Sequence, residues 1–271
     1  MSLVEVAQET LQICHAGTYV APSGREVDIR TAQAAAVAGA RLYTPEEQAS
    51  LLAGSSRNHS GSRPSIEVTA ETTQQAAQRL AVGGPVTVLN YASARNPGGG
   101  FLRGAVAQEE DLCRCSGLYL TQVQHLAYYQ ANRAEESLIY TDHLIWSPAV
   151  PFFRLTAQDL LEAPFEASVI TSPAPNAGEE LRRDPGAGLR IYEALLRRTG
   201  MWLAVAEAQG ARRLVLGAWG CGVFRNNPVE VADVFGGWLA SARFSGAFDE
   251  VVFAVYGRPE ANLEAFRARF G

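Results

Sequence analysis

The stretch PVTVLNYASARNPGGGFLRGAVAQEE, residues 85–110, joins an apolar run, three consecutive glycines and two adjacent glutamates. The apolar run at 85–90 ends in a polar residue, which is typical of a buried strand whose carboxyl end borders a site. The glycines at 98–100 allow backbone N–H groups to press against a sugar or a phosphate. Glu109 and Glu110 stand where a helix should begin. Acidic residues are favoured there by the helix dipole alone, but glycosidic-bond chemistry also needs carboxylates beside a polar loop.

From residue 64 onward, apolar runs alternate with helical patterns. This alternation predicts an α/β fold in which helices cover both faces of a mostly parallel or mixed sheet. Polar or glycine-rich loops follow three of the expected strands, at Asn90, Ser172 and Gly217. Ligands in such sheets bind beyond the carboxyl ends of strands, so we expect these loops to form one pocket. Strands are expected at 66–69, 85–90, 138–146, 167–172, 213–217 and 251–256, a turn at 150–154, and helices at 72–82, 108–128, 188–209, 228–242 and 261–270.

The beginning of the chain has a different pattern. Thr44 and Glu47 form a capping box at a helix start, and the polar, glycine- and serine-rich residues 54–63 predict a linker or loop. We therefore expect residues 1–60 to form an N-terminal, mainly helical extension packed on a main domain of residues 61–271. Within the extension, helices are expected at 2–15, 29–40 and 44–54, and a short hairpin at 19–27.

A second glycine-rich stretch is GAWGCGVFRNNP, residues 217–228. A strand, a glycine-rich turn and then a helix is an arrangement that binds pyrophosphate through free backbone N–H groups and the positive end of the helix. The stretch is not a P-loop, because no Gly-Lys-Ser/Thr follows, and its spacing is not a Rossmann fingerprint. A tight structural turn is the alternative interpretation.

Composition restricts the classes of protein. The 271 residues carry a net charge of −5, with 47% hydrophobic and 19% charged residues, as in a soluble globular protein without a basic surface for nucleic acid. No apolar run of about 18 residues predicts a membrane span, and the N-terminus does not resemble a secretory signal. The four cysteines and four histidines show no Cys-x-x-Cys or His-x-x-x-His spacing. We expect reduced thiols, a cytoplasmic setting, and neither a metal nor a cofactor.

Several other residues invite a functional interpretation but have simpler explanations. Cys221 could be a nucleophile, yet no histidine is adjacent in sequence, so a small residue beside a phosphate is the preferred interpretation. Structural roles are expected for the rest: a strand-edge pair for Asp142 and His143, helix packing for Tyr128, Tyr129 and Trp202, and solvated faces for Arg182, Arg183, Arg197 and Arg198.

Three glycines, seven residues and then Gln-Glu-Glu resemble the signature of the poly(ADP-ribose) glycohydrolases, in particular the compact bacterial type. The Trp-Gly-Cys-Gly-x-Phe of residues 219–224 is similar to the diphosphate-binding loop of that family and stands in the family's order. The resemblance covers roughly residues 64–271, with sharp motifs only in these two places. It implies a macrodomain-like α/β/α sandwich with a mixed central sheet that binds ADP-ribose.

The resemblance also implies roles for individual residues. Glu110 would be the catalytic acid and base, and Glu109 would hold the ribose hydroxyls. Asn90 or Asn96 would bind the terminal ribose, and Phe224 would pack against it. The triglycine would shape the ribose pocket, and N–H groups at 220–222 would bind the diphosphate. The complete set of expected substrate-binding residues is Asn90, Asn96, Gly98, Gly99, Gly100, Gln108, Gly217, Trp219, Gly220, Cys221, Gly222, Val223 and Phe224.

The implied activity is hydrolysis of the ribose–ribose O-glycosidic bonds of poly(ADP-ribose) to ADP-ribose, on ADP-ribosylated proteins and without a metal. We also expect the protein to be a monomer. Glu110 must start protonated although a helix N-terminus favours the ionised form. We expect burial, the charge of Glu109 and the diphosphate of the substrate to outweigh the dipole. Two alternatives stay open: a reader that binds ADP-ribose without cleaving it, which needs no carboxylate at this position, and a hydrolase that removes single ADP-ribose units.

Overall fold

The computed structural model describes residues 1–54 and 62–271, so most of the expected linker at 54–63 lies outside the described residues. The helices are α1 (Leu3–Ala16), α2 (Arg30–Gly39), α3 (Pro45–Ala53), α4 (Thr73–Ala81), α5 (Gln108–Cys115), α6 (Leu118–Gln122), α7 (Leu126–Ala134), α8 (Ala177–Arg183), α9 (Gly188–Ala208), α10 (Pro228–Ala240) and α11 (Glu260–Phe270), with 3₁₀ turns η1 (Phe101–Arg103) and η2 (Ala242–Phe244). The strands are β1 (Thr18–Val20), β2 (Glu26–Asp28), β3 (Arg41–Tyr43), β4 (Ser65–Thr69), β5 (Val86–Tyr91), β6 (Leu144–Arg154), β7 (Leu160–Ser172), β8 (Arg213–Leu216) and β9 (Glu250–Ala254).

The central sheet is mixed, as predicted. Its seven strands lie in the order β3-β6-β7-β5-β8-β9-β4. The five strands from β7 to β4 are parallel, whereas β6 and β3 are antiparallel to their neighbours. Tyr91 at the end of β5 lies opposite Ser172 at the end of β7. The loops that leave β5, β7 and β8 therefore emerge at one edge of the sheet, which is where the sequence places its glycine-rich motifs.

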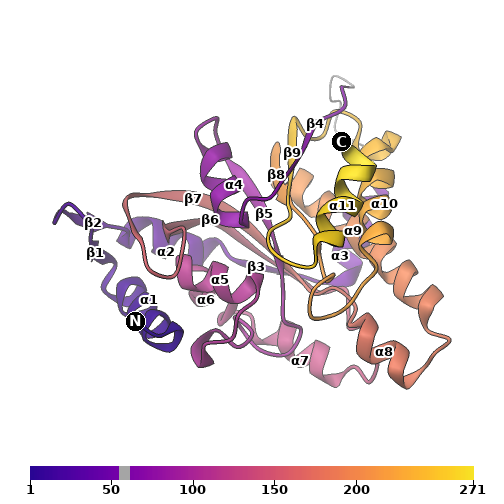
Figure 1. Ribbon diagram of the computed structural model, residues 1–271, viewed down its shortest axis with the longest axis horizontal. Helices are drawn as coiled ribbons and strands as arrows, with labels where there is room; N and C mark the ends of the chain where they lie inside the picture. Colours follow the sequence, from indigo (N-terminus) through magenta and orange to yellow (C-terminus); the bar gives the residue numbers. More distant parts are fainter. Residues whose placement is uncertain (55–61) are drawn as a thin grey trace.

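Helices cover both faces of this sheet (Figure 1). Alternate residues of the central strands enter different cores: Val88 packs with α4, α5 and α6, and Leu89 packs on the opposite face with α9, α10 and α11. This explains the continuous apolar run of β5, because a strand buried on both faces does not alternate in polarity. No helix in the described part of the chain is long and apolar enough to cross a membrane.

The first 54 residues contain the expected helices and hairpin, and Thr44 and Glu47 form both hydrogen bonds of the predicted capping box. One strand was not predicted: β3 pairs with β6 and forms an edge of the central sheet. Helix α1 also packs on α5 and η1, and the hydroxyl of Thr10 donates to the carbonyl oxygen of Arg114 at 2.8 Å. The N-terminal segment thus supports the elements that carry the two glutamates, and the domain division at residue 60 stays a prediction.

The single long helix expected at 108–128 is wrong, because the segment forms α5, α6 and α7. Ser116 is extended and forms an antiparallel bridge with Phe152 of β6. Gly117 follows, and its carbonyl oxygen accepts a hydrogen bond from the Gln33 side chain at 3.2 Å. The helical periodicity is therefore interrupted by pairing with a strand 36 residues further along the chain.

The strand limits near the β6–β7 hairpin also differ from the expectation. The strand predicted from residue 138 begins at Leu144, and the turn predicted at 150–154 is part of β6. Its pairing with β7 shifts in register between Ser147 and Val150, and Ala149 there has a φ of 43°. Pro148 thus belongs to a bulge inside the strand, which is one of the few places where a strand tolerates proline.

The prediction of a solvated face is wrong for Arg198 but not for Arg197, whose side chain is exposed. Arg198 is fully buried, and its Nε donates to Asp142 Oδ1 at 2.9 Å, while Arg197 Nε donates to Asp142 Oδ2 at 2.7 Å. The structural role expected for Asp142 is confirmed, because this carboxylate neutralises a buried guanidinium. The packing roles expected for Tyr128, Tyr129 and Trp202 are also confirmed, since all three are fully buried.

Candidate active site

A cavity of about 520 Å³ lies beside the carboxyl ends of β5 and β8. It brings the loop after β5, the start of α5 and the loop after β8 together, as the sequence predicts. The loop after Ser172, which was expected at the same pocket, contributes no lining residue. The predicted residues that line it are Asn96, Gly99, Gly100, Gln108, Glu109, Glu110, Gly220, Gly222, Val223 and Phe224. Sequence reasoning missed Tyr91, Ser93, Arg103, Val106, Ala107, Ala218, Ala254, Val255, Tyr256, Arg258 and Asn262, several of which follow β9, where no motif marks a site.

The triglycine loop touches the glutamates through its backbone. Gly98 and Gly99 have φ values of 62° and 59°, in the left-handed region that favours glycine. A Cβ on Gly99 would overlap Oε1 of Glu110 and lie 3.1 Å from Oε2 of Glu109. Gly100 donates its N–H to Glu110 Oε1 at 2.8 Å. The glycines are therefore needed both for the chain path and for the approach of two carboxyl groups.

Glu110 has one oxygen engaged by the protein and one available to a ligand. Its side chain lines the cavity and the residue is 8% exposed. Oε1 accepts the Gly100 N–H, whereas the described residues supply no hydrogen bond to Oε2. A carboxyl group held in this way has a fixed orientation and still offers an oxygen for proton transfer.

Glu109 is held more completely. It is 2% exposed, and its Oε1 accepts hydrogen bonds from Asn90 Nδ2 at 3.0 Å and Gln122 Nε2 at 2.9 Å. Its Oε2 accepts the N–H of Ser93 at 2.7 Å. Burial raises the pKa of Glu109 to about 8, and the three donated hydrogen bonds act in the opposite direction. These three donors come from β5, from the loop that follows β5, and from α6. Together they fix the orientation of the Glu109 side chain.

Gln108 fixes the start of α5 against the end of β5. Its Oε1 accepts the N–H of Tyr91 at 2.8 Å, and its Nε2 donates to the Leu89 carbonyl oxygen at 2.8 Å and to Thr73 Oγ1 at 3.1 Å. The amide of Gln108 is thus used within the protein, although the residue borders the cavity. Gln108 sets the position from which Glu109 and Glu110 project.

The loop after β8 is anchored by an aromatic and an amide side chain, Trp219 and Asn226. Trp219 is fully buried, and its Nε1 donates to the Ser172 carbonyl oxygen at 3.1 Å. Asn226 Nδ2 donates to the carbonyl oxygens of Pro175 at 2.8 Å and Gly220 at 3.0 Å. These bonds hold the loop against the segment that follows β7.

Among the described residues, an acceptor is assigned to only one of the three N–H groups predicted at 220–222, that of Cys221. The Cys221 N–H donates to the Ala218 carbonyl oxygen at 3.1 Å, so it is not available to a diphosphate. Within residues 1–54 and 62–271, no acceptor is assigned to the N–H groups of Gly222, Val223 and Phe224. Helix α10 begins at Pro228, which does not line the cavity. Any anion bound here would meet the loop backbone and not the helix end.

Five predicted site residues do not line the cavity: Asn90, Gly98, Gly217, Trp219 and Cys221. Each supports the site from behind. Asn90 is fully buried and donates to Glu109, which leaves Asn96 as the asparagine that borders the cavity. Gly217 leaves room for Tyr91, whose hydroxyl would overlap a Cβ at that position. Sequence alone could not separate Asn90 from Asn96, because both lie near the same glycines.

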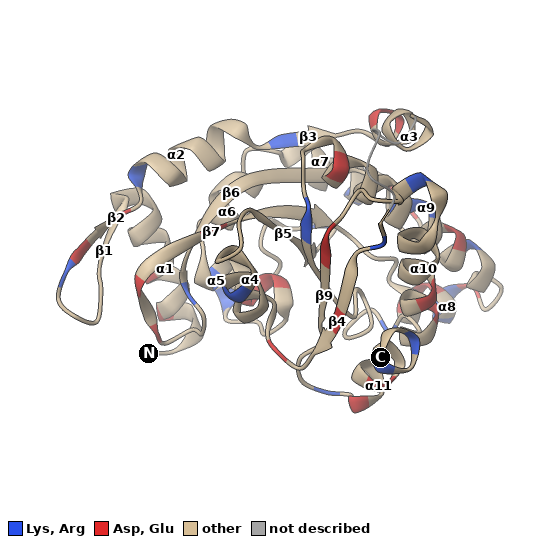
Figure 2. Ribbon diagram, turned by 90° about the horizontal axis from the view of Figure 1, so that it is seen from above, with Lys and Arg blue, Asp and Glu red and all other residues tan. Residues whose placement is uncertain are grey.

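Positive charge is supplied locally. Arg103 and Arg258 border the cavity. Elsewhere, Figure 2 shows basic and acidic residues interspersed over the ribbon, with no side of one sign. An anionic ligand would therefore be attracted by this site and not by a charged face. Among the described residues, no group of three or more His, Cys, Asp or Glu side chains is arranged to hold a metal ion.

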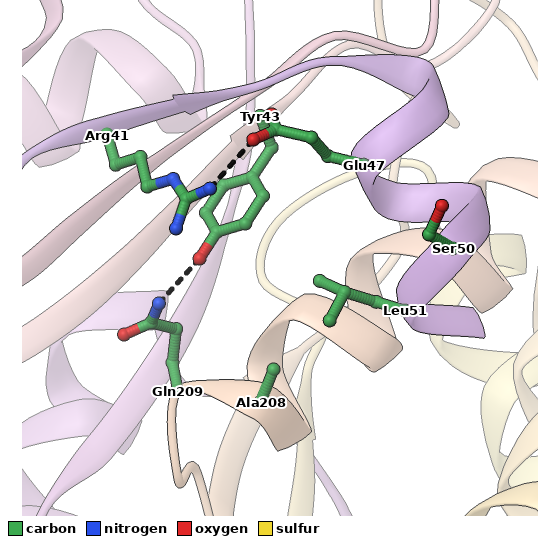
Figure 3. A pocket seen from close by; sticks show the side chains of 7 residues that line it. All are labelled: Arg41, Tyr43, Glu47, Ser50, Leu51, Ala208 and Gln209. Atoms are coloured by element: carbon green, nitrogen blue, oxygen red, sulfur yellow. Dashed lines mark hydrogen bonds and ion pairs between the residues drawn. The ribbon is translucent and has the colours of Figure 1, made fainter. Parts of the chain in front are cut away.

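A second cavity of about 480 Å³ lies between β3, α3 and the end of α9 (Figure 3). Its polar side chains bind one another: Arg41 pairs with Glu47 at 2.7 Å, and Gln209 donates to the Tyr43 hydroxyl at 2.6 Å. These side chains therefore leave few hydrogen-bonding groups available to a ligand. The remaining lining residues are Ser50, Leu51 and Ala208, and neither glycine-rich motif contributes a residue to this cavity.

Replacing Cys221 with alanine should leave hydrolytic activity within about threefold of wild type, since the thiol has no catalytic environment. The residue is 7% exposed, its Sγ donates to the Trp219 carbonyl oxygen at 3.7 Å, and burial raises the pKa of the thiol to about 12. A steady-state assay of the Cys221→Ala variant is the measurement. Complete loss of turnover in a folded variant would contradict this prediction and show that turnover depends on the thiol.

An α/β/α sandwich of the macrodomain type, with two buried glutamates against a triglycine loop, defines a class of glycosidases that act on ADP-ribose derivatives. The model of the microbial-type PARG (poly(ADP-ribose) glycohydrolase) catalytic domain matches residues 7–155. The chain belongs to this family and is a poly(ADP-ribose) glycohydrolase. A comparison with curated proteins found no match.

Solved structures resemble the whole chain. The poly(ADP-ribose) glycohydrolase from Thermomonospora curvata is 46% identical, with a TM-score of 0.93 and coverage of 99% of both chains. The structure of that enzyme bound to the inhibitor ADP-HPD has a TM-score of 0.90, again at 46% identity and 99% coverage of both chains. The enzyme from Deinococcus radiodurans in complex with ADP-ribose is 45% identical, with a TM-score of 0.81, and the match covers 88% of this chain and 96% of that one.

Proposed function

We propose that the enzyme hydrolyses the ribose–ribose O-glycosidic bonds of poly(ADP-ribose) and releases ADP-ribose, with Glu110 as general acid and base. The observation that carries this proposal is the position of Glu110. The Gly100 N–H engages one carboxyl oxygen, and the other is free at the cavity. A reader of ADP-ribose has no use for a carboxyl group placed in this way.

In the proposed reaction, Glu110 gives up one proton in the first step and takes one back in the second. Protonated Glu110 gives its proton to the departing ribose oxygen as the bond to the anomeric carbon breaks. The positive charge that develops on the sugar is stabilised by the diphosphate of the substrate and by the carboxyl oxygens of Glu109. Water then attacks the anomeric carbon and transfers a proton to Glu110, which restores the acid. One water is consumed, and two hydroxyl groups are formed.

The proposed ligand is ADP-ribose at the end of a polymer, in keeping with the ligands of the relatives from Thermomonospora curvata and Deinococcus radiodurans. Its diphosphate would bind the N–H groups of residues 222–224, with Arg103 and Arg258 as nearby cations. Its terminal ribose would contact Asn96 and Glu109. Phe224 would pack on the same ribose, supported by the ring of Tyr140 at a centroid distance of 6.1 Å.

Incubation with automodified poly(ADP-ribose) polymerase tests the proposal. We expect free ADP-ribose as the product, with the last, protein-linked unit left in place, because the proposed reaction cleaves only ribose–ribose bonds. Chromatography of the soluble products and mass spectrometry of the protein provide the measurement. Removal of the last unit would indicate a mono-ADP-ribosyl hydrolase, and binding without any product would indicate a reader.

The setting proposed for this reaction is the cytoplasm, with ADP-ribosylated proteins as the substrates and the enzyme acting as a monomer. All four cysteines are free and buried, which is compatible with a reducing compartment. In the proposed arrangement, residues 1–60 support the catalytic region of residues 61–271.

A further inference from the structure

Gln122 connects the triglycine loop to Glu109. It is the last residue of α6, is fully buried and does not line the cavity. Its Oε1 accepts the N–H of Gly98 at 2.9 Å, and its Nε2 donates to Glu109 Oε1 at 2.9 Å. The orientation of the amide is determined, because a backbone N–H can only donate and therefore must face the amide oxygen.

The position of Gln122 is itself fixed from several sides. Thr121 shares a hydrogen bond of 2.7 Å with Ser147 of β6, which ties α6 to the sheet. Asn90, the second side-chain donor to Glu109 Oε1, also donates to Thr171 Oγ1 at 3.2 Å. Donors from β5 and α6 thus converge on one carboxyl oxygen, and only the donor from α6 also holds the glycine loop.

We propose that Gln122 is a positioning residue for the glycosidase reaction, coupling the path of the triglycine loop to the orientation of Glu109. This inference rests on the proposed function. If the loop moves away at Gly98, Gln122 Oε1 loses the N–H that it accepts, and the amide is no longer held against Glu109. A Glu109 that turns away frees the amide that holds the loop. The residue acts through Glu109 and the loop without touching the substrate.

A carboxyl group in place of the Gln122 amide provides a charge-sensitive test. One oxygen would still accept the Gly98 N–H, and the other would face Glu109. The two carboxyl groups can stay in contact only while they share a proton, so their contact is lost as pH rises. The other titratable or charged groups around them are Glu110 and Cys113 of α5, Tyr119 of α6, Tyr128 and Tyr129 of α7, and Arg198 behind Tyr128.

These neighbours should not mimic the expected pH effect. Burial raises the pKa of Cys113, Tyr128 and Tyr129 well above their ordinary values, and burial also raises the pKa of Tyr119. They stay neutral between about pH 5 and pH 9. Glu109 and Glu110 are present in every variant, so dividing the activity of a variant by that of wild type at each pH removes their own contribution.

The experiment compares Gln122→Leu and Gln122→Glu with wild type and with Gln124→Glu. Gln124 is exposed two residues further along and donates only to the Leu120 carbonyl oxygen at 3.2 Å, so it is a matched control. Gln122→Leu should lower kcat about 10²-fold at every pH, as expected for misplaced reacting groups. Gln122→Glu should retain more activity near pH 5 and lose it progressively towards pH 9, whereas the control ratio stays flat.

Two measurements separate this inference from the proposed function. Hydrogen–deuterium exchange should be faster at the Gly98 amide in Gln122→Leu than in wild type or in the Gln124 control, whatever the activity. Wild-type protein that releases no ADP-ribose would refute the proposed function. Active wild type with an equally active Gln122→Leu, a flat pH ratio for Gln122→Glu, or unchanged exchange at Gly98 would each overturn the role of Gln122.

Discussion

Replacing Glu110 with glutamine should lower kcat for poly(ADP-ribose) hydrolysis by about 10²–10⁴-fold, the usual contribution of a general acid and base. Glutamine cannot give a proton to the departing ribose oxygen or take one from water. Its carbonyl oxygen can still accept the Gly100 N–H, which Glu110 Oε1 accepts at 2.8 Å, so the loop should keep its position. Binding of ADP-ribose, measured by calorimetry, should change little.

Glu193→Gln is a suitable control for this variant. It removes the same charge from an exposed position on α9, away from the cavity. Both variants should unfold at temperatures close to that of wild type, and only Glu110→Gln should lose turnover. If Glu110→Gln kept near wild-type kcat, another group would have to supply the proton, and Glu109 would become the first residue to test.

Replacing Gly99 with alanine should reduce activity by about 10²-fold, because a displacement of roughly 1 Å at a reacting group has effects of this size. The new methyl group would overlap Oε1 of Glu110 and crowd Oε2 of Glu109. The carboxyl group of Glu110 would have to leave the Gly100 N–H. The φ of 59° would also cost an alanine about 1–2 kcal/mol of folding free energy, since a Cβ is disfavoured there.

A second variant, Gly24→Ala, separates the displacement of the carboxyl groups from the backbone strain at positive φ. Gly24 has a φ of 87°, but nothing lies within 4 Å of a Cβ at this position between β1 and β2. Both variants should therefore lose stability, as measured by denaturant unfolding, and only Gly99→Ala should lose turnover. Equal activity of the two variants would mean that the carboxyl groups tolerate displacement, which contradicts the geometry inferred for the site.

Much of the fold could be predicted from local signals. Thr44 and Glu47 mark a helix start because a capping box involves four consecutive residues. The apolar run of β5 predicts a strand buried on both faces, and the strand contributes Val88 and Leu89 to opposite cores. The expected convergence of the loops after β5 and β8 is confirmed, because parallel neighbours end at the same edge.

The errors occurred where distant segments overrode a local pattern. The periodicity of 108–128 favours one helix, but Ser116 pairs with Phe152, and the helix divides into three. Arg198 is a polar residue on a helix and was assigned to solvent, yet Asp142 neutralises it in the interior. The division of the helix and the burial of Arg198 depend on distant partners. Propensity and periodicity, which involve only a few neighbouring residues, cannot predict either of them.

By itself, the sequence determined the α/β class, the positions of most of the main strands along the chain, the family resemblance, and the two glutamates and glycine loops expected at one pocket. Only the tertiary structure decided what each of these residues does there. It placed Asn96 at the cavity and Asn90 behind Glu109, engaged the Cys221 N–H within the loop, and brought Gln122 between Gly98 and Glu109. The reason is physical: a motif specifies residue types and short-range backbone geometry, whereas hydrogen-bond partners depend on which remote segments pack together.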